Sequence, residues 1–365
     1  MEVQTTPAPG ETAPVLPRAA YLDPAWFEAE QALLFARSWL FAGLARELAA
    51  DGDYLTVEAG PTPLLVVRTG DGLRAFRNIC RHRGARLLEG RGNAKVITCP
   101  YHRWCYGRDG RLRGMPDANR FPAWTRELGL VEARVANWNG MLFVNADEGA
   151  EPFEAWLGSA AGTLWRWPVE ALVEVQRDAK DVGANWKLFV ENHIDGYHLA
   201  HLHRDSLRGL DHARQSWRSA GRHWLFFEPP LDAAGPPAVE SRWLPRIAGL
   251  DAGHAGSTVW HLFPAFAGAA GATYFAVLNI VPLAPDRTRI ERRVLTAQAS
   301  AGRLIAAAAE EWWGRRRGDV FAEDSRAVEA VQRAMRAPGW REGPLADGFE
   351  TAIRRFREAV AKDLA

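Results

Sequence analysis

The chain has 365 residues, 47% of them hydrophobic and 24% charged, with a formal net charge of +1. This near-neutral balance gives no electrostatic support for binding nucleic acid or an anionic membrane surface. Three cysteines are too few for a disulfide framework, which predicts reduced thiols and a cytoplasmic location.

The first part of the chain predicts an arm, a helix and a β domain. Polar and proline residues over 1–20 indicate a disordered arm and not a secretory signal. Residues 21–40 predict an N-terminal helix that packs on the second domain, with Asp23 as its cap and Pro24 in its first position. Short apolar runs between glycine-containing turns predict a small antiparallel β domain over 41–150.

Residues 151–365 predict a larger α+β domain. The stretch 263–284 carries no charge, but prolines and glycines interrupt it, which favours two buried strands and a turn over a membrane span. Apolar periodicity predicts the remaining elements: long strands within 258–297 and helices at 185–206, 303–336 and 348–364.

The β domain contains a motif of metal-ligand side chains, CRHRGARLLEGRGNAKVITCPYHRW, with Cys80, His82, Cys99 and His102. Each of its two loops offers one cysteine and one histidine, whereas a zinc finger usually takes its cysteines from one loop and its histidines from another. Two such loops can hold a two-iron cluster with thiolates on one iron and imidazoles on the other. The motif predicts a Rieske [2Fe–2S] centre, with a structural zinc site as the alternative.

A second group of candidate ligands lies in ENHIDGYHLAHLH, which holds four of the ten histidines of the chain. His198 and His201 are three residues apart and would share one face of a regular helix. His198 and His203 are five apart, which places them about 140° from each other around such a helix. Helical spacing alone therefore favours His198 and His201, while His193 has a structural interpretation.

With both motifs, the chain resembles the catalytic α subunit of Rieske non-haem iron oxygenases from Tyr21 onward. CRHRGARL and CPYHRWCYGRDGRLRGMP resemble the cluster loops, and NWKLFVENHIDGYH resembles the iron-binding helix. The resemblance implies an N-terminal Rieske β domain and a C-terminal helix-grip-like catalytic domain. One departure is Arg103, because the family usually has glycine after the second cluster histidine.

The resemblance implies a mononuclear Fe(II) held by two histidines and one carboxylate, with positions open for O₂ and substrate. The family spacing D-x-x-H-x-x-x-x-H falls on Asp195, His198 and His203, so we expect the helix to end or distort between the two histidines. His201 is the alternative second ligand. Asp195 would orient His198 and, by the resemblance, link it to His102 of the neighbouring subunit.

The third iron ligand is expected to be Asp324, in VFAEDSRAVEAVQRAM. It falls in line with an apolar stripe, and an ionised carboxylate that faces a core is costly unless it is paired or binds a metal. Glu323 lies about 100° around the helix and is expected to face elsewhere. The alternative is a buried salt bridge of Asp324. The predicted stripe consists of Val320, Val328, Val331 and Met335.

The implied function is O₂-dependent hydroxylation of a small organic substrate, by mono- or dioxygenation or oxidative demethylation. NAD(P)H would supply electrons through a separate reductase, with or without a ferredoxin, because the sequence has no dinucleotide-binding fingerprint. We expect a homotrimer, since a closed ring can bring the cluster of one chain to the iron of the next. One face of STVWHLFPAF is expected to line the substrate pocket. The alternative functions are a Rieske electron-transfer protein and a metal-stabilised binding module.

Overall fold

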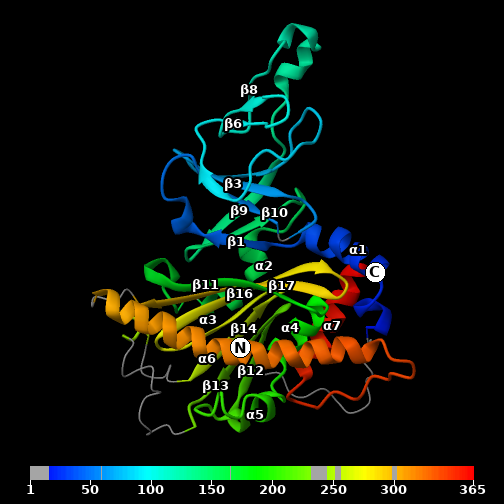
Figure 1. The fold of residues 1–365 in the computed structure, drawn as a ribbon, viewed down its shortest axis with the longest axis vertical. Coiled ribbons are helices and arrows are strands. Elements are labelled where there is room, and N and C mark those ends of the chain that lie inside the picture. The colour runs from blue at the N-terminus through cyan, green and yellow to red at the C-terminus, as the bar shows by residue number, and fades with distance from the viewer. Residues whose placement is uncertain (1–15, 59, 165, 232–244, 251–255, 298–301) are drawn as a thin grey trace. The chain divides into compact units, whose positions relative to one another are not determined.

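The computed structural model describes residues 16–58, 60–164, 166–231, 245–250, 256–297 and 302–365, with the backbone alone for 302–318. Most of the expected arm lies outside these residues. The chain forms two compact units. We call Gln31–Trp156 the β-rich unit, and the residues up to Glu30 together with Leu157–Ala365 the helix–sheet unit (Figure 1). No helix in the described part has both the length and the apolar character needed to cross a bilayer.

The β-rich unit is built on an antiparallel sheet whose interior strand β3 is buried over most of its length. Its spatial order is β1 (Leu40–Leu44), β10 (Met141–Asn145), β9 (Glu132–Trp138), β4 (Gly72–Arg77), β3 (Leu64–Thr69), β2 (Asp53–Val57) and β5 (Arg91–Asn93). A smaller sheet contains β6 (Ile97–Thr98), β7 (Cys105–Tyr106) and β8 (Leu112–Gly114). Side chains from both sheets, among them Leu65, Phe76 and Ile97, share one core with Cys80 and Cys99.

The helix–sheet unit contains the second antiparallel sheet. Its spatial order is β11 (Leu172–Val182), β17 (Arg287–Ala297), β16 (Tyr274–Ala284), β15 (Phe266–Ala270), β14 (Ser257–Leu262), β13 (His223–Glu228) and β12 (Ser216–Ala220). The uncharged stretch 263–284 forms β15 and β16, so the prediction of two buried strands is confirmed. The predicted combination of a β-rich part followed by an α+β part is also confirmed.

Helices of the helix–sheet unit meet at α4 (Trp186–Ile194), which contacts α6, α7, β14 and β16. The long helix α6 (Gly302–Met335) crosses in front of the sheet in Figure 1. This unit also contains α3 (Ala160–Leu164), α5 (Leu199–Leu202) and α7 (Thr351–Leu364), whereas α2 (Phe153–Leu157) begins in the β-rich unit. Both α4 and α6 carry candidate metal ligands, so their packing decides whether those ligands meet.

The N-terminal helix is shorter than the sequence indicated. Helix α1 covers only Pro24–Ala29, and the Asp23 side chain caps it by accepting a hydrogen bond from the Ala25 amide (2.8 Å). The chain then continues through a π-helical turn (Glu30–Leu34) and a 3₁₀ turn (Phe35–Arg37). The expectation of a single helix over 21–40 was therefore wrong. The change of helix type begins at Glu30, whose side chain is fully buried against α4.

Buried charges attach α4 to segments far away in the sequence. The ammonium group of Lys187 pairs with the carboxylate of Glu30, and neither side chain is exposed. Glu191 accepts a hydrogen bond from the Tyr21 hydroxyl (2.6 Å) and two from the Arg357 guanidinium (2.8 and 3.0 Å). Burial lowers the pKa of Lys187, against the opposing effect of Glu30. Because breaking a buried pair leaves an uncompensated charge, these contacts hold α4 in one position.

Candidate metal centres

The helix that carries the histidines ends earlier than expected. Helix α4 stops at Ile194, and α5 then lies between His198 and His203. The Asp195 carboxylate accepts a hydrogen bond from the Tyr197 amide (2.6 Å), which satisfies that amide outside a helix. One break therefore precedes His198, and helix α5 in turn ends at Leu202. The expectation that the helix ends between the two histidines is confirmed, with an additional break before them. The turn and the short helix bring the two histidines together even though they are five residues apart.

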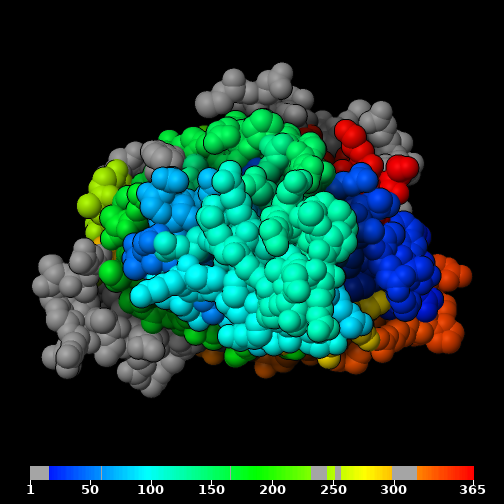
Figure 2. All heavy atoms as spheres, turned by 90° about the horizontal axis from the view of Figure 1, so that it is seen from above, coloured from blue at the N-terminus to red at the C-terminus, as the bar shows by residue number. Residues whose placement is uncertain are grey.

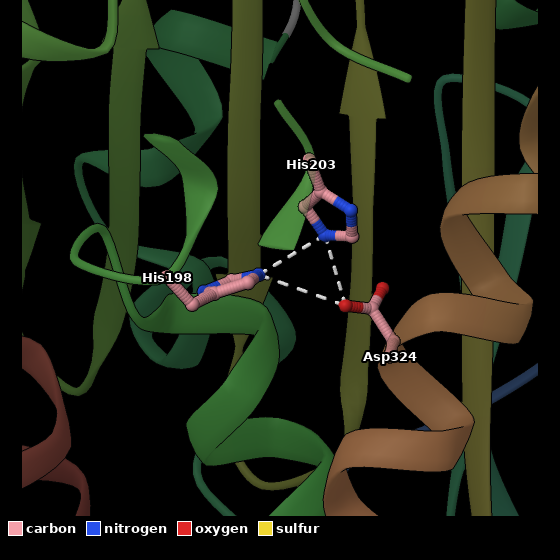
Figure 3. Close-up of side chains that lie close together, drawn as sticks. All are labelled: His198, His203 and Asp324. Carbon is pink, nitrogen blue, oxygen red and sulfur yellow. Dashed lines mark hydrogen bonds and ion pairs between the residues drawn. The ribbon is translucent and has the colours of Figure 1, made fainter. Parts of the chain in front are cut away.

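Three candidate ligands converge on one point, as Figure 3 shows. The Nε2 atoms of His198 and His203 lie 3.1 Å apart. The Oδ1 atom of Asp324, on α6, lies 2.9 Å from Nε2 of His203 and 3.6 Å from Nε2 of His198. One ligand atom from each residue can thus face a common ion. Two imidazoles and one carboxylate are the donor set of a mononuclear non-haem iron, so the residues fit that metal.

Each member of this group also contacts a polar neighbour. Oδ2 of Asp195 lies 3.3 Å from Nδ1 of His198. The Asn192 amide donates to Oδ1 of Asp324 (2.8 Å). Sequence reasoning identified the first of these contacts and missed the second. The signal for Asn192 was its place three residues before Asp195, in the same histidine-rich motif.

Glu323 does not face elsewhere, as the sequence was thought to indicate. Its Oε2 atom lies 2.7 Å from Nδ1 of His203, on the side of the ring opposite Asp324. The 100° between successive helix positions describes the Cα–Cβ direction, and the longer glutamate side chain reaches around to the histidine. The expectation was wrong because it ignored side-chain length.

The buried face of α6 also differs from the predicted stripe. Val328 and Met335 are buried as expected, but Val331 is 44% exposed and Gln332 takes the buried position. Oε1 of Gln332 accepts a hydrogen bond from the amide of Asn185 (2.8 Å), directly before α4. At this turn of α6, the side chain that makes the hydrogen bond is buried and the valine side chain is left exposed. It fixes α6, and with it Asp324, against the start of α4.

The charges of the three ligands are strongly coupled. Burial lowers the pKa of His198, but the carboxylates of Asp195 and Asp324 outweigh it and raise the pKa to about 9. The pKa of His203 is raised in the same way, against burial, by Asp324 and Glu323. Burial raises the pKa of Asp324, but hydrogen bonds from both histidines hold it well below its usual range. A metal cation would replace the protons that gather here, because imidazole binds metals in its neutral form.

The other two histidines of the motif lie outside this group. His201 is exposed, and its ring stands edge-on to Tyr197 with the centroids 5.3 Å apart. Nε2 of His193 lies 3.1 Å from the carbonyl oxygen of Trp260, on β14. The arrangement therefore supports His203, and not His201, as the partner of His198.

Side chains fill both faces of the strand that was expected to line the pocket. His261 and Phe263 pack against Phe356 of α7. On the other face, Trp260 stacks on Phe275 with the ring centroids 5.7 Å apart. Trp260, His261 and Phe263 are at most 1% exposed. Contact of either face with a substrate stays a prediction.

The four candidate cluster ligands lie together in the β-rich unit. Cys80 and Cys99 are 3% and 1% exposed, and the rings of His82 and His102 are 4.7 Å apart between centroids. The His82 ring stacks on Trp104 (4.9 Å, 4° between planes). Its Nδ1 atom is buried and has no hydrogen-bond partner among the described residues. A buried nitrogen without a partner fits a metal ligand, so these residues fit a [2Fe–2S] cluster.

The two cluster loops have the same backbone design. The amide of Gly84 donates to the carbonyl of Cys80 (3.0 Å), and the amide of Arg103 donates to the carbonyl of Cys99 (3.1 Å). Both donors have a positive φ, 73° for Gly84 and 61° for Arg103. Glycine adopts this conformation without strain, whereas another residue loses roughly 1 kcal/mol or more. This backbone requirement gives a physical reason for the glycine that the family usually has at the Arg103 position.

A tyrosine that the sequence did not single out contacts the cluster site. The hydroxyl oxygen of Tyr106 lies 3.3 Å from the sulfur of Cys80 and accepts a hydrogen bond from the amide of Arg81 (3.0 Å). Because its oxygen already accepts from a backbone amide, its proton is available to the sulfur. Residues of the cluster loops and the segment after them, coloured cyan to turquoise, face the viewer in Figure 2. Among the loop residues, Tyr101 is 58% exposed.

Comparisons with known proteins identify two domains in this chain. The family profile for the ring hydroxylating alpha subunit (catalytic domain) matches residues 169–365, and the Rieske [2Fe-2S] domain profile matches residues 38–129. Chloroplastic choline monooxygenase from Spinacia oleracea is 27% identical over 95% of this chain and 78% of that protein. The anthranilate 1,2-dioxygenase large subunit from Acinetobacter baylyi is 34% identical over 62% of this chain and 50% of that protein. The quaternary ammonium Rieske monooxygenase CntA, solved with L-carnitine, superposes with a TM-score of 0.79 and 25% identity over 96% of this chain and 95% of that one.

Proposed function

Because this chain belongs to the ring-hydroxylating alpha subunits, a family of Rieske-type oxygenases, we propose that it hydroxylates a small organic substrate with O₂ at a mononuclear Fe(II). One oxygen atom would enter the substrate in a monooxygenation, and the other would leave as water with two electrons and two protons. NAD(P)H would supply the electrons through a separate reductase, with or without a ferredoxin, in the cytoplasm. The observation that carries this proposal is the convergence of His198, His203 and Asp324 at 2.9–3.6 Å.

The iron site needs ligands that leave part of the metal open. His198, His203 and Asp324 would hold the Fe(II) from three sides, and the metal would supply the site at which O₂ is activated. The chain positions these groups with α5, which separates the histidines, and with Gln332, which fixes α6 beside α4. The carboxylate of Asp195 would keep a proton on Nδ1 of His198, so that Nε2 of that ring faces the metal.

The cluster would be held by Cys80, His82, Cys99 and His102, and it would supply electrons one at a time. The Nδ1 atom of His82 is buried and has no hydrogen-bond partner in the described part of the chain, which supports its role as a ligand. The sulfurs lie in the core, and the Trp104 ring covers the His82 imidazole.

We further propose that the enzyme works as a homotrimer. A head-to-tail ring lets each chain offer its cluster to one neighbour and its iron site to the other. Asp195 would then contact His198 in its own chain and His102 of the neighbouring subunit. The Asp195 carboxylate is partly exposed next to the 52% exposed Tyr197, so it is accessible to another chain.

The metal content tests the proposed function directly. Anaerobically reconstituted protein should contain about three irons and two acid-labile sulfides per chain and show the spectrum of a Rieske cluster. Two irons and two sulfides, with no substrate-dependent O₂ consumption, would indicate an electron-transfer protein. One zinc and no sulfide would indicate a structural metal site.

For the substrate class, we propose an amine that carries N-methyl groups. Choline monooxygenase and CntA act on such compounds by their names, and an aromatic wall can bind a quaternary ammonium group. In this chain Trp217 lies beside Gly196, two residues before His198, and forms an aromatic pair with Phe226 (4.5 Å between centroids). Choline, glycine betaine and carnitine should stimulate O₂ and NADH consumption with a matching oxidised product. Turnover of anthranilate alone would refute this substrate class.

A further inference from the structure

His203 is held by carboxylates on both sides of its ring. Nε2 faces Oδ1 of Asp324 at 2.9 Å, and Nδ1 faces Oε2 of Glu323 at 2.7 Å. The two carboxylates are neighbours in sequence on α6, and the His203 side chain is only 1% exposed. A single turn of α6 therefore contributes the proposed metal ligand and the group that contacts the far side of a second ligand.

The position of Glu323 is itself fixed. The hydroxyl of Ser206 donates a hydrogen bond to the same Oε2 atom (2.7 Å). Ser206 lies three residues after His203, so the loop that carries the histidine also holds the carboxylate. A carboxylate oxygen that receives two donors has little freedom to rotate away.

We propose that Glu323 is a positioning residue for the mononuclear metal: it accepts a hydrogen bond from Nδ1–H of His203, which keeps the proton on Nδ1 and leaves the lone pair of Nε2 directed at the ion. This inference rests on the proposed function, because it requires that His203 binds a metal. A carboxylate behind a metal-bound imidazole fixes its tautomer and ring orientation and makes the metal-binding nitrogen more basic.

Each proposed iron-binding histidine would then have its own carboxylate, but the two contacts differ. Asp195 lies 3.3 Å from Nδ1 of His198 and is partly exposed, whereas Glu323 lies 2.7 Å from Nδ1 of His203 and is tied to Ser206. The shorter contact, braced by a second donor, should make the larger contribution to metal retention. Glu323 would thus hold the metal site together, which leaves Asp195 available for a contact outside its own chain.

The test compares metal binding by the full-length protein, with its Rieske cluster loaded, and by its Glu323→Gln variant. Asp319→Asn is the matched control, since Asp319 is an exposed carboxylate on the same helix. Fe(II) affinity is measured by competition with a chelator, and Co(II) is placed in the mononuclear site to record its visible spectrum. We expect Glu323→Gln to weaken Fe(II) binding by about 10–100-fold and to shift the Co(II) bands. Asp319→Asn should match the wild type in both measurements.

The possible outcomes are separable. Wild-type affinity and an unchanged Co(II) spectrum in Glu323→Gln would overturn the inference, as would an equal loss in Asp319→Asn. If Glu323→Gln loses the Rieske spectrum and therefore does not fold, Ser206→Ala decides: a several-fold weaker affinity supports the inference, and an unchanged one overturns it. A wild-type protein that binds no mononuclear metal would instead refute the proposed function.

Discussion

The two candidate metal centres of this chain are built in opposite ways. The cluster ligands come from two loops within residues 80–102 of the β-rich unit, and both loops close with the same backbone hydrogen bond. The iron ligands come from a broken helix and from α6, which are more than a hundred residues apart in the sequence. The first centre depends on local turns, whereas the second depends on helix packing.

The surroundings of the two centres differ in charge as well. The cluster site places a hydroxyl group, that of Tyr106, next to the Cys80 sulfur and packs the indole of Trp104 on His82. The iron site places the carboxylates of Asp195 and Glu323 behind its two imidazoles. Beside His82 the nearby charge is cationic and not anionic: burial lowers the pKa of this histidine, and His102 and Arg83 lower it further. Carboxylates suit a metal that must be retained while part of its coordination sphere stays open.

The largest expected effects come from two substitutions, each of which removes one metal centre and leaves the other in place. Cys80→Ser should abolish the Rieske spectrum and leave the mononuclear iron in place, while His203→Ala should remove about one iron of three and leave the Rieske spectrum intact. Both variants should have no substrate turnover. Iron and sulfide analysis measures the metal content of each variant, and electron paramagnetic resonance detects the Rieske cluster. His201→Ala is the control, and its loss of the mononuclear iron would show that His201 is the true ligand.

The next effect concerns Asp195, which is proposed to connect the iron site of one subunit to the cluster of its neighbour. Asp195→Asn is isosteric, so both metals should stay bound, but the negative charge next to His198 disappears. Turnover should fall by about 100-fold or more, and the reduced cluster should no longer be reoxidised rapidly when substrate and O₂ are added. Stopped-flow absorbance of the cluster records this step. Asp205→Asn changes an exposed carboxylate in the same loop and serves as the control; rapid reoxidation in Asp195→Asn would exclude this electron route.

A smaller effect is expected at the cluster. Tyr106→Phe removes a hydroxyl that can donate to the Cys80 sulfur and thereby stabilise the extra electron of the reduced state. One such hydrogen bond contributes about 1 kcal/mol, so the reduction potential should fall by roughly 20–60 mV. Spectroscopic redox titration measures the shift, and the mononuclear iron content should not change. An unchanged or higher potential would mean that the hydroxyl does not donate to the sulfur.

The smallest effect lies in the core of the helix–sheet unit, away from both ligand sets. Burial, with smaller contributions from His193 and His223, lowers the pKa of His261 to about 3, against the raising effect of its hydrogen bond with the Pro264 carbonyl. Unfolded histidine titrates near pH 6.5. Below that pH the unfolded state binds a proton at His261 that the folded state does not bind, so the free energy of unfolding decreases as the pH falls. Between pH 7.5 and 5.5 the wild type should lose about 1 kcal/mol more than His261→Gln in urea unfolding. Parallel pH profiles of the two proteins would contradict this.

How far the sequence predicted each centre follows from how each is built. Cys80, His82, Cys99 and His102 are close in sequence, so their spacing alone indicated a cluster site. His203 and Asp324 came from resemblance to a family and from the cost of burying a carboxylate, and their binding of iron stays a prediction.

The parts that sequence reasoning missed depend on contacts between distant segments. The helix break before His198 is set by a turn at Asp195, and the reach of Glu323 depends on where α5 places His203. Gln332 is buried in place of Val331 because the Asn185 amide needs an acceptor. Periodicity along one helix carries no information about a hydrogen-bond donor on another.

The attachment of α4 by buried charges has a consequence for biosynthesis. The β-rich unit is one continuous segment, so the ribosome completes it as soon as Trp156 has emerged. The helix that leads to His198 has to wait, since the carboxylate of Glu191 meets its guanidinium partner only when Arg357 has been made. Domains fold as units during translation. Cluster insertion can therefore begin on the nascent chain, whereas the proposed mononuclear iron would bind only after Arg357 has left the ribosome.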